Sequence, residues 1–164
     1  MKKDTYIAVV GPSAAAPAEH ALGEEIGRLI AEAGAVLVCG GLGGLMEAAA
    51  SGCAKAGGRS VGVLPTETRA GGNPYLTTVV ATGMGEARNA IVVRTADAVI
   101  AVRGEFGTLS EIALALRAGT PVIALNAPEV SLAGADAVIR VASVEEALRV
   151  MDRILAGANR SDGA

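Results

Sequence analysis

The chain has 164 residues, of which 51% are hydrophobic and 2% aromatic, with 22 glycines and a formal net charge of −3. This length suits one domain, and so high a hydrophobic fraction excludes an intrinsically disordered chain. The acidic balance argues against nucleic acid as a partner. Gly, Pro or charged residues break every apolar run before the roughly 18 residues that a membrane span needs, so we expect no membrane association.

The two cysteines, Cys39 and Cys53, do not form a CxxC pair. Both lie in apolar segments, which predicts buried free thiols in a reducing compartment. The basic start of the chain is followed by an apolar run of only five residues, which is too short for a secretory signal. We therefore expect a cytoplasmic protein.

Short apolar strands alternate with helical segments along almost the whole chain. The expected strands cover residues 6–10, 35–39, 60–64, 77–81, 98–102, 121–125 and 137–141. The expected helices cover residues 17–33, 44–56, 85–95, 108–118 and 144–156. Most of the strands are continuous runs of Val, Ile, Leu and Ala, which is typical of strands buried on both faces of a parallel sheet.

This alternation predicts one doubly wound, Rossmann-like α/β domain, a three-layer sandwich around a mainly parallel sheet of about seven strands. No linker divides the chain. The domain is expected to cover residues 1–157, and residues 158–164 form a polar tail that we expect to be frayed. In this architecture ligands bind beyond the carboxyl ends of the strands.

Three expected strands end in loops that contain glycine. Backbone N–H groups can approach a ligand closely at glycine, and at a helix N-terminus they attract anions. We therefore predict a site for a small phosphorylated ligand. Its candidate binding residues are Gly11 and Ser13 in the first loop, Gly40, Gly41, Gly43, Gly44 and Met46 in the second, and Arg103, Gly104, Phe106, Gly107 and Thr108 in the third. Phe106 is the aromatic residue best placed to stack on a base.

Several other chemistries lack the residues they need. The chain has no GxxxxGK[ST] motif, and Met46 stands at the third glycine position of a dinucleotide fingerprint. His20 is the only histidine, which leaves too few ligands for a histidine-based metal site and argues against a Ser-His-Asp triad. No lysine is well placed for a Schiff base, so pyridoxal phosphate chemistry is not expected. We expect no cofactor and no bound metal.

Arg88 and Glu111 are the titratable residues that attract attention near these loops, and each has two interpretations. The stretch from Thr108 to Glu111 has the pattern of a helix capping box, which also occurs from Ser143 to Glu146. Glu111 is therefore either a cap or a functional carboxylate. Arg88, at the start of a helix, is either a solvated first-turn residue or a ligand contact.

Three segments in order resemble the LONELY GUY-type proteins, long mislabelled lysine decarboxylases, among which are cytokinin riboside 5′-monophosphate phosphoribohydrolases. These segments are residues 40–46, the Met84-x-x-x-Arg88 spacing and residues 104–111. The chain is also similar to a short bacterial branch of Rossmann-fold nucleotide-binding proteins that resembles molybdenum cofactor carrier proteins.

The resemblance implies a catalytic role for Glu111 and Arg88, and a phosphate-holding role for residues 41–44 and 107–108. Arg103, Glu105 and Asn89 depart from the family pattern, and Glu105 adds negative charge to a loop that would hold an anion. The resemblance also implies a homodimer or higher homo-oligomer.

Two functions therefore stay open. The first is hydrolysis of a nucleoside 5′-monophosphate to base and ribose 5-phosphate, with Glu111 stabilising positive charge or activating water. The second is non-catalytic binding or carriage of a nucleotide or of a pterin-phosphate such as the molybdenum cofactor.

Overall fold

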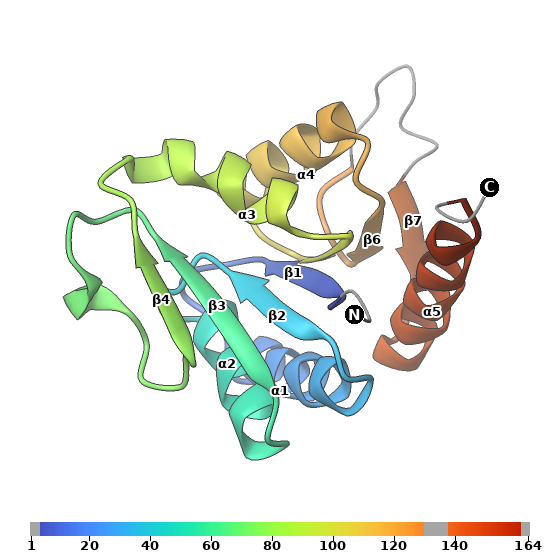
Figure 1. Cartoon of the computed structure of the whole chain (residues 1–164), viewed down its shortest axis with the longest axis horizontal. Coiled ribbons are helices and arrows are strands. Elements are labelled where there is room, and N and C mark those ends of the chain that lie inside the picture. Colours follow the sequence, from blue (N-terminus) through green and yellow to red (C-terminus); the bar gives the residue numbers. More distant parts are fainter. Residues whose placement is uncertain (1–3, 130–137, 162–164) are drawn as a thin grey trace.

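A seven-stranded, all-parallel sheet forms the centre of the protein (Figure 1). The structure, a computed structural model, describes residues 4–129 and 138–161. The strands lie in the order β4-β3-β2-β1-β5-β6-β7. Their bounds are β1 Tyr6–Val10, β2 Val36–Cys39, β3 Arg59–Leu64, β4 Thr78–Ala81, β5 Ala98–Val102, β6 Val122–Leu125 and β7 Val138–Val141.

The predicted α/β class and parallel sheet are confirmed. Every expected strand exists and begins within one residue of its predicted start, apart from the last, whose predicted first residue, 137, lies outside the described residues. The four central strands β2, β1, β5 and β6 are buried along their whole length, save for the half-buried Tyr6, because helices cover both faces. This burial explains why their sequences are continuous apolar runs.

Helices pack on both faces of the sheet. Their bounds are α1 Pro17–Glu32, α2 Leu45–Lys55, α3 Asn89–Thr95, α4 Phe106–Ala118 and α5 Val144–Ser161. Side chains of α1, α2 and α5 share one hydrophobic core with Ile7 and Val9 of β1. Side chains of α3 and α4 share a second core with Ala8 and Val10 of the same strand. Successive β1 residues thus serve opposite faces, which produces the three layers of Figure 1.

Small residues let α1 and α2 pack unusually close together. A Cβ on Gly27 of α1 would lie 1.8 Å from the carbonyl oxygen of Ala49, and a Cβ on Gly52 of α2 would lie 1.8 Å from that of Glu24. Neither position can hold a larger side chain without separating the helices. The abundance of glycine and alanine therefore serves close helix packing as well as the loops.

Three helix boundaries differ from the sequence prediction by more than one residue. The segment 85–95 divides into a 3₁₀ turn, η2, over Gly85–Arg88 and the helix α3. Helix α4 begins at Phe106, two residues before the predicted start. Helix α5 extends to Ser161, past the predicted domain end at residue 157. The second of these differences changes the interpretation of Glu111, as shown below.

The strand order reverses at β1, which lies between β2 and β5. The chain first builds β1, β2 and β3 outward in one direction, and later returns to place β5 on the other side of β1. Loops that follow β1 and β5 therefore diverge at the carboxyl edge of the sheet, where doubly wound folds leave a crevice. Any ligand site of this fold is expected there.

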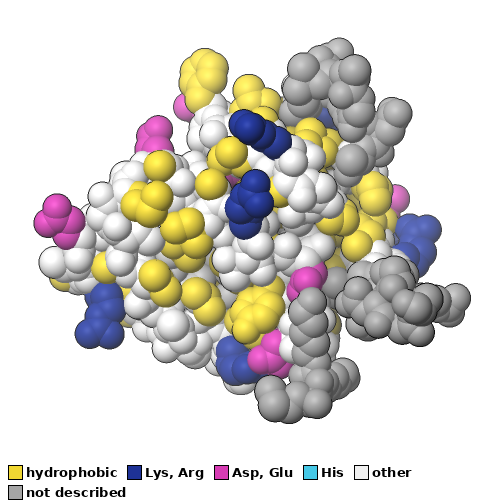
Figure 2. Space-filling model, turned by 45° about the horizontal axis from the view of Figure 1, so that its top comes forward, with side chains coloured by type: hydrophobic (Ala, Val, Ile, Leu, Met, Phe, Trp, Pro, Cys, Tyr) yellow, Lys and Arg dark blue, Asp and Glu magenta, His cyan; other side chains and the backbone are white. Residues whose placement is uncertain are grey.

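Cys39 and Cys53 are both buried and free, as predicted. None of the described helices is long and apolar enough to cross a bilayer. On the side covered by α3 and α4, hydrophobic side chains are scattered among polar ones and charged groups are sparse (Figure 2). The large hydrophobic side chains that are exposed in the described residues are Tyr75, Val80, Met84, Ile91, Phe106 and Ile139.

Candidate functional site

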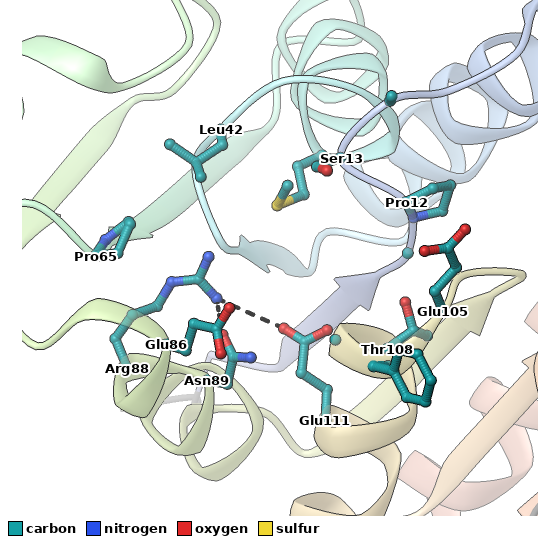
Figure 3. A pocket seen from close by; sticks show the side chains of 15 residues that line it. Pro12, Ser13, Leu42, Pro65, Glu86, Arg88, Asn89, Glu105, Thr108 and Glu111 are labelled. Atoms are coloured by element: carbon teal, nitrogen blue, oxygen red, sulfur yellow. Dashed lines mark hydrogen bonds and ion pairs between the residues drawn. The ribbon is translucent and has the colours of Figure 1, made fainter.

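A pocket of about 570 Å³ lies at the strand-order reversal. Its walls come from the loops after β1, β2, β3 and β5, from the first turn of α2, from η2 and α3, and from the first two turns of α4 (Figure 3). The lining residues are Gly11, Pro12, Ser13, Ala14, Leu42, Met46, Pro65, Glu86, Arg88, Asn89, Glu105, Phe106, Gly107, Thr108 and Glu111. The expectation of a crevice at this edge of the sheet is thus met by the structure.

Arg88 and Glu111 point toward one another in the wall of this pocket (Figure 3). Nη1 of Arg88 lies 3.6 Å from Oε1 of Glu111, and each residue is only 7% exposed. The same Nη1 donates a hydrogen bond to Oδ1 of Asn89. An oppositely charged pair is therefore buried in the wall of the pocket, where the lack of water strengthens its interaction.

Burial also changes the protonation of Glu111. Desolvation raises the pKa of its carboxyl group to about 7, although the guanidinium of Arg88 acts in the opposite direction. Desolvation favours the neutral form of a carboxyl group because that form needs less hydration. Glu111 can consequently gain or lose a proton near neutral pH, which is a property of many functional carboxylates.

The guanidinium of Arg88 is held tightly but incompletely satisfied. A Cβ at Gly40 would lie 2.6 Å from its Nη2, so only glycine lets the guanidinium approach the second loop this closely. Nε of Arg88 is buried and has no hydrogen-bond partner within the described part of the chain. A buried donor without an acceptor costs about 1–3 kcal/mol, which is a cost commonly tolerated at functional sites.

Glu111 is not a helix cap. Helix α4 begins at Phe106 with Glu105 as its N-cap residue, and no side chain makes a capping hydrogen bond. Thr108 is then the third residue of the helix, and Glu111 lies in its second turn with its side chain turned to the pocket. The capping-box interpretation is therefore wrong, and so is the solvated interpretation of Arg88, since Arg88 is buried.

The loop after β5 starts α4 early because it turns sharply. Arg103 and Gly104 both have positive φ, 41° and 95°. A Cβ on Gly104 would lie 1.9 Å from Oγ1 of Thr108, so a side chain there would collide with the first turn of the helix. This tight turn places the N–H groups of Phe106, Gly107 and Thr108, which have no partner inside the helix, at the pocket.

Eight of the fourteen predicted site residues line the pocket. They are Gly11, Ser13, Met46, Arg88, Phe106, Gly107, Thr108 and Glu111. Their binding or catalytic roles remain predictions. Phe106, at 86% exposed, stands at the pocket with its ring largely in solvent.

The other six predicted residues do not line it, and they are Gly40, Gly41, Gly43, Gly44, Arg103 and Gly104. Gly44 instead approaches the carbonyl oxygens of Pro12 and Ser13, and N–H of the next residue, Leu45, donates to Pro12. Arg103 turns away to α1, where its Nε lies 3.1 Å from Oε1 of Glu19. These residues shape the loops around the pocket.

Seven lining residues were not predicted as site residues. They are Pro12, Ala14, Leu42, Pro65, Glu86, Asn89 and Glu105. Most of them are immediate neighbours of predicted site residues, so the sequence indicated the right loops although it did not identify these residues. Pro65 directly follows β3 and could have been found by taking every strand end into account.

The segment after β3, residues 66–75, does not line the pocket. Its contribution is indirect. Asn73 is buried, and its Nδ2 donates to the carbonyl oxygens of Gly41 and Leu42 at 3.3 and 3.1 Å. The loop thereby fixes the second glycine-rich turn, from which Leu42 reaches the pocket.

No group of three or more His, Cys, Asp and Glu residues that could hold a metal ion occurs in the described ranges 4–129 and 138–161. The groups that face the pocket are the buried guanidinium of Arg88, three carboxyl groups and the free N–H groups at the start of α4. An apolar side is formed by Leu42, Met46 and Pro65.

The chain is similar to several known proteins. An uncharacterized protein of Archaeoglobus fulgidus is 44% identical over 124 residues, which cover 76% of this chain and 82% of that protein. The molybdenum cofactor binding protein of Rippkaea orientalis has a structure with a TM-score of 0.89 and 34% identity, over 94% of this chain and 99% of that one.

The molybdenum cofactor carrier protein of Chlamydomonas reinhardtii has a TM-score of 0.83 and 30% identity, over 93% of this chain and 99% of that one. The family model that matches the chain covers residues 4–152 and describes the SLOG cluster4 family. This match spans both hydrophobic cores and every loop of the pocket. The chain therefore belongs to the SLOG cluster4 family.

Proposed function

We propose that this protein binds and carries a phosphorylated pterin of the molybdenum cofactor type in the pocket that Arg88 and Glu111 line. The observation that carries the proposal is the buried Arg88–Glu111 pair in the wall of a pocket at the strand-order reversal. The likeness to molybdenum cofactor binding and carrier proteins, at 30–34% identity over nearly their whole length, supports this choice of ligand.

The residues present suit such a ligand. A phosphate group would be held by the free N–H groups at the start of α4 and by the hydroxyl group of Thr108, since a helix N-terminus favours anions. The planar ring would pack against the apolar side formed by Leu42, Met46 and Pro65. Arg88, which lines the pocket, would donate from its guanidinium to an acceptor on the ligand.

The charge of the pocket favours carriage over tight retention. Glu86, Glu105 and Glu111 line it together with one guanidinium, that of Arg88. Carboxylates near a bound phosphate weaken its binding by like-charge repulsion. A protein that must release its ligand to an acceptor benefits from moderate affinity.

Ligand-dependent stabilisation tests the proposal. The pterin cofactor released from a purified molybdoenzyme should raise the melting temperature of the protein, because a ligand that binds only the folded state stabilises it. Arg88→Met should abolish this rise. Arg149→Met, which removes an exposed arginine from α5, should leave it unchanged. No stabilisation by the released cofactor would contradict the proposal.

Hydrolysis of a nucleoside 5′-monophosphate is the second candidate, and one observation favours it. A carboxyl group whose pKa lies at about 7, beside an arginine in a pocket, suits general acid or base catalysis. Incubation with a panel of nucleoside monophosphates, followed by assay of free base and ribose 5-phosphate, tests this activity. Turnover that Glu111→Gln abolishes would establish the enzyme, and no turnover with any of them would leave the carrier.

We also propose a cytoplasmic homo-oligomer. The exposed hydrophobic side chains Val80, Met84 and Ile91 offer material for contacts between copies. Light scattering on the purified protein should give a mass of at least twice the 16.2 kDa of one chain. A monomer at all concentrations would contradict this part of the proposal.

A further inference from the structure

The carboxylate of Glu111 lies in the pocket wall with its oxygens open to the pocket. Its side chain is nine-tenths buried, yet its oxygens are not among the fully enclosed polar atoms without a partner in the described residues, so they reach the space that a ligand would fill. The 3.6 Å that separates it from Nη1 of Arg88 is an ion-pair distance, too long for a hydrogen bond. Buried carboxylates are normally hydrogen-bonded, so this one is arranged to accept donors from a ligand in the pocket that it lines.

We propose that Glu111 reads the edge of the ligand's ring and selects heterocycles in which an amino group stands next to a ring N–H. This inference rests on the proposed ligand-binding site. An ionised carboxylate is acceptor-only and presents two parallel oxygens, so it pairs best with two adjacent donors. The 2-amino-4-oxopyrimidine edge, shared by pterin and guanine, offers two such donors side by side.

Arg88 completes the recognition of the same edge. In a 2-amino-4-oxopyrimidine the ring carbonyl stands next to the ring N–H, on the side opposite the amino group. The guanidinium of Arg88 stands beside the carboxylate and is fixed there by its hydrogen bond to Asn89 and by its close approach to Gly40. Carboxylate and guanidinium together therefore match the order amino, N–H, carbonyl along the ring.

Other ring edges fit less well. Adenine presents an acceptor nitrogen beside its amino group, and this nitrogen would face an oxygen of Glu111. Hypoxanthine keeps the ring N–H and the carbonyl but lacks the amino group, so one carboxylate oxygen stays unsatisfied. A site built to bind a donor rejects the analogue that lacks it, because the buried group is then left unpaired.

Two pairs of commercially available probes isolate the amino group. Guanosine 5′-monophosphate and inosine 5′-monophosphate differ only by it, and pterin differs from lumazine by an amino group in place of an oxo group. Binding is measured by isothermal titration at about pH 8, and release of free base is followed to detect any hydrolysis of the nucleotides. The member of each pair that carries the amino group should bind at least about tenfold more tightly, which is the affinity ratio expected for one hydrogen bond to a charged group. Adenosine 5′-monophosphate should bind no better than inosine 5′-monophosphate.

Glu111→Gln should bring the affinity ratio within each probe pair close to one, because the amide of Gln offers a donor where the ligand also has a donor. The matched control is Glu86→Gln, which removes an exposed carboxylate from the same pocket. It should raise the affinity for both nucleotides by the same factor and leave their ratio unchanged. A ratio near one in the native protein overturns the inference even if the Glu111 variant fails to fold.

The remaining outcomes separate this inference from the proposed function. A ratio that survives Glu111→Gln, or no binding of any of these probes, overturns the inference. Stabilisation by the released molybdenum cofactor without discrimination in either probe pair preserves the carrier function and overturns the role of Glu111. If the protein discriminates within the probe pairs but is not stabilised by the released cofactor, the role of Glu111 is preserved and the carrier function is overturned.

Discussion

Helices α4 and α5 carry the same Ser/Thr-x-x-Glu pattern near their starts but use it differently. In α5, Oγ of Ser143 accepts a hydrogen bond from N–H of Glu146 at 3.3 Å, and Oε2 of Glu146 accepts one from N–H of Ala142 at 2.9 Å. In α4 the helix starts before Thr108, so the pattern makes no cap and Glu111 is buried in the pocket. The position of the helix start, more than the pattern, decides what the glutamate does.

The two starts also differ in electrostatics. A hydrogen bond from the Ser143 hydroxyl lowers the pKa of the exposed Glu145 at the start of α5. Burial raises the pKa of Glu111. Acidification should thus weaken the charge interactions of the first region and relieve the desolvation in the second.

Arg88→Met should destabilise the protein by about 3–5 kcal/mol at pH 8, because it leaves the carboxylate of Glu111 buried without its partner. The loss should shrink below about pH 7, where Glu111 takes up a proton and no longer carries a charge. Urea unfolding at several pH values measures both effects.

The double variant Arg88→Met with Glu111→Gln should recover most of the lost stability, since neither charge is then left alone. Arg149→Met on α5 should stay within about 0.5 kcal/mol of the native protein, as substitutions at exposed sites usually do. A loss in Arg88→Met that does not depend on pH would show that the pair is not what the substitution disrupts.

The stability difference between the native protein and Glu111→Gln should depend on pH in one direction. The pKa of Glu111 in the folded state, about 7, lies above its ordinary value of 4.5. Its contribution to stability is therefore fully present below about pH 4.5 and is lost as the pH rises through 7. The shift corresponds to about 3 kcal/mol.

Glu145→Gln should show the opposite trend. The folded-state pKa of Glu145 is lowered, so its carboxylate stabilises the protein at pH values above its ordinary pKa of 4.5. This contribution is lost as the pH falls through the folded-state pKa. Chemical denaturation of the three proteins between about pH 3 and pH 8 gives the differences. Parallel profiles for the two substitutions would contradict the contrast between the helix starts.

Gly40→Ala should disturb the pocket without altering a charge. Its Cβ would come within 2.6 Å of Nη2 of Arg88 and 2.8 Å of Sδ of Met46, so the guanidinium must move. We expect a loss of about 1–3 kcal/mol, as for overpacking elsewhere, and a weaker influence of Arg88 on Glu111. Gly71→Ala is the control, because nothing lies within 4 Å of its added Cβ. Thermal unfolding and a carboxyl titration by NMR measure the two effects.

The sheet could be predicted from the sequence because strands that are buried on both faces consist almost entirely of apolar residues. Val99 and Ile100 of β5 face opposite cores, so the whole strand must be apolar, and such a run is visible without any tertiary information. The glycine-rich loops likewise indicated the edge of the sheet at which the pocket lies. Each of these features is formed by residues that are neighbours in the chain, so it can be recognised in the sequence alone.

Both Arg88 and Glu111 were candidates from the sequence, but their direct contact could not be predicted, because it depends on the directions of side chains from separate elements. Arg88 closes the turn η2, and Glu111 lies on α4, beyond a further strand. Arg103 shows the same limit: its place in a glycine-rich loop suggested a phosphate contact, but its positive φ and the carboxylate of Glu19 turn it toward α1. Backbone turns of this kind leave no clear sequence signal at a non-glycine residue.

The smallest expected effect compares the two hydroxyl groups of the shared pattern. Ser143→Ala should cost about 1 kcal/mol, since the Ser143 hydroxyl accepts an N–H at the start of α5. Thr108→Val should cost less than about 0.5 kcal/mol, because Thr108 is not the cap of α4 and its hydroxyl makes no capping hydrogen bond, so only its shape contributes to folding. Urea unfolding at about pH 7 measures both. If Thr108→Val costs as much as Ser143→Ala, its hydroxyl stabilises the start of α4 after all, and the distinction between a cap that serves folding and a hydroxyl left free for a ligand is lost.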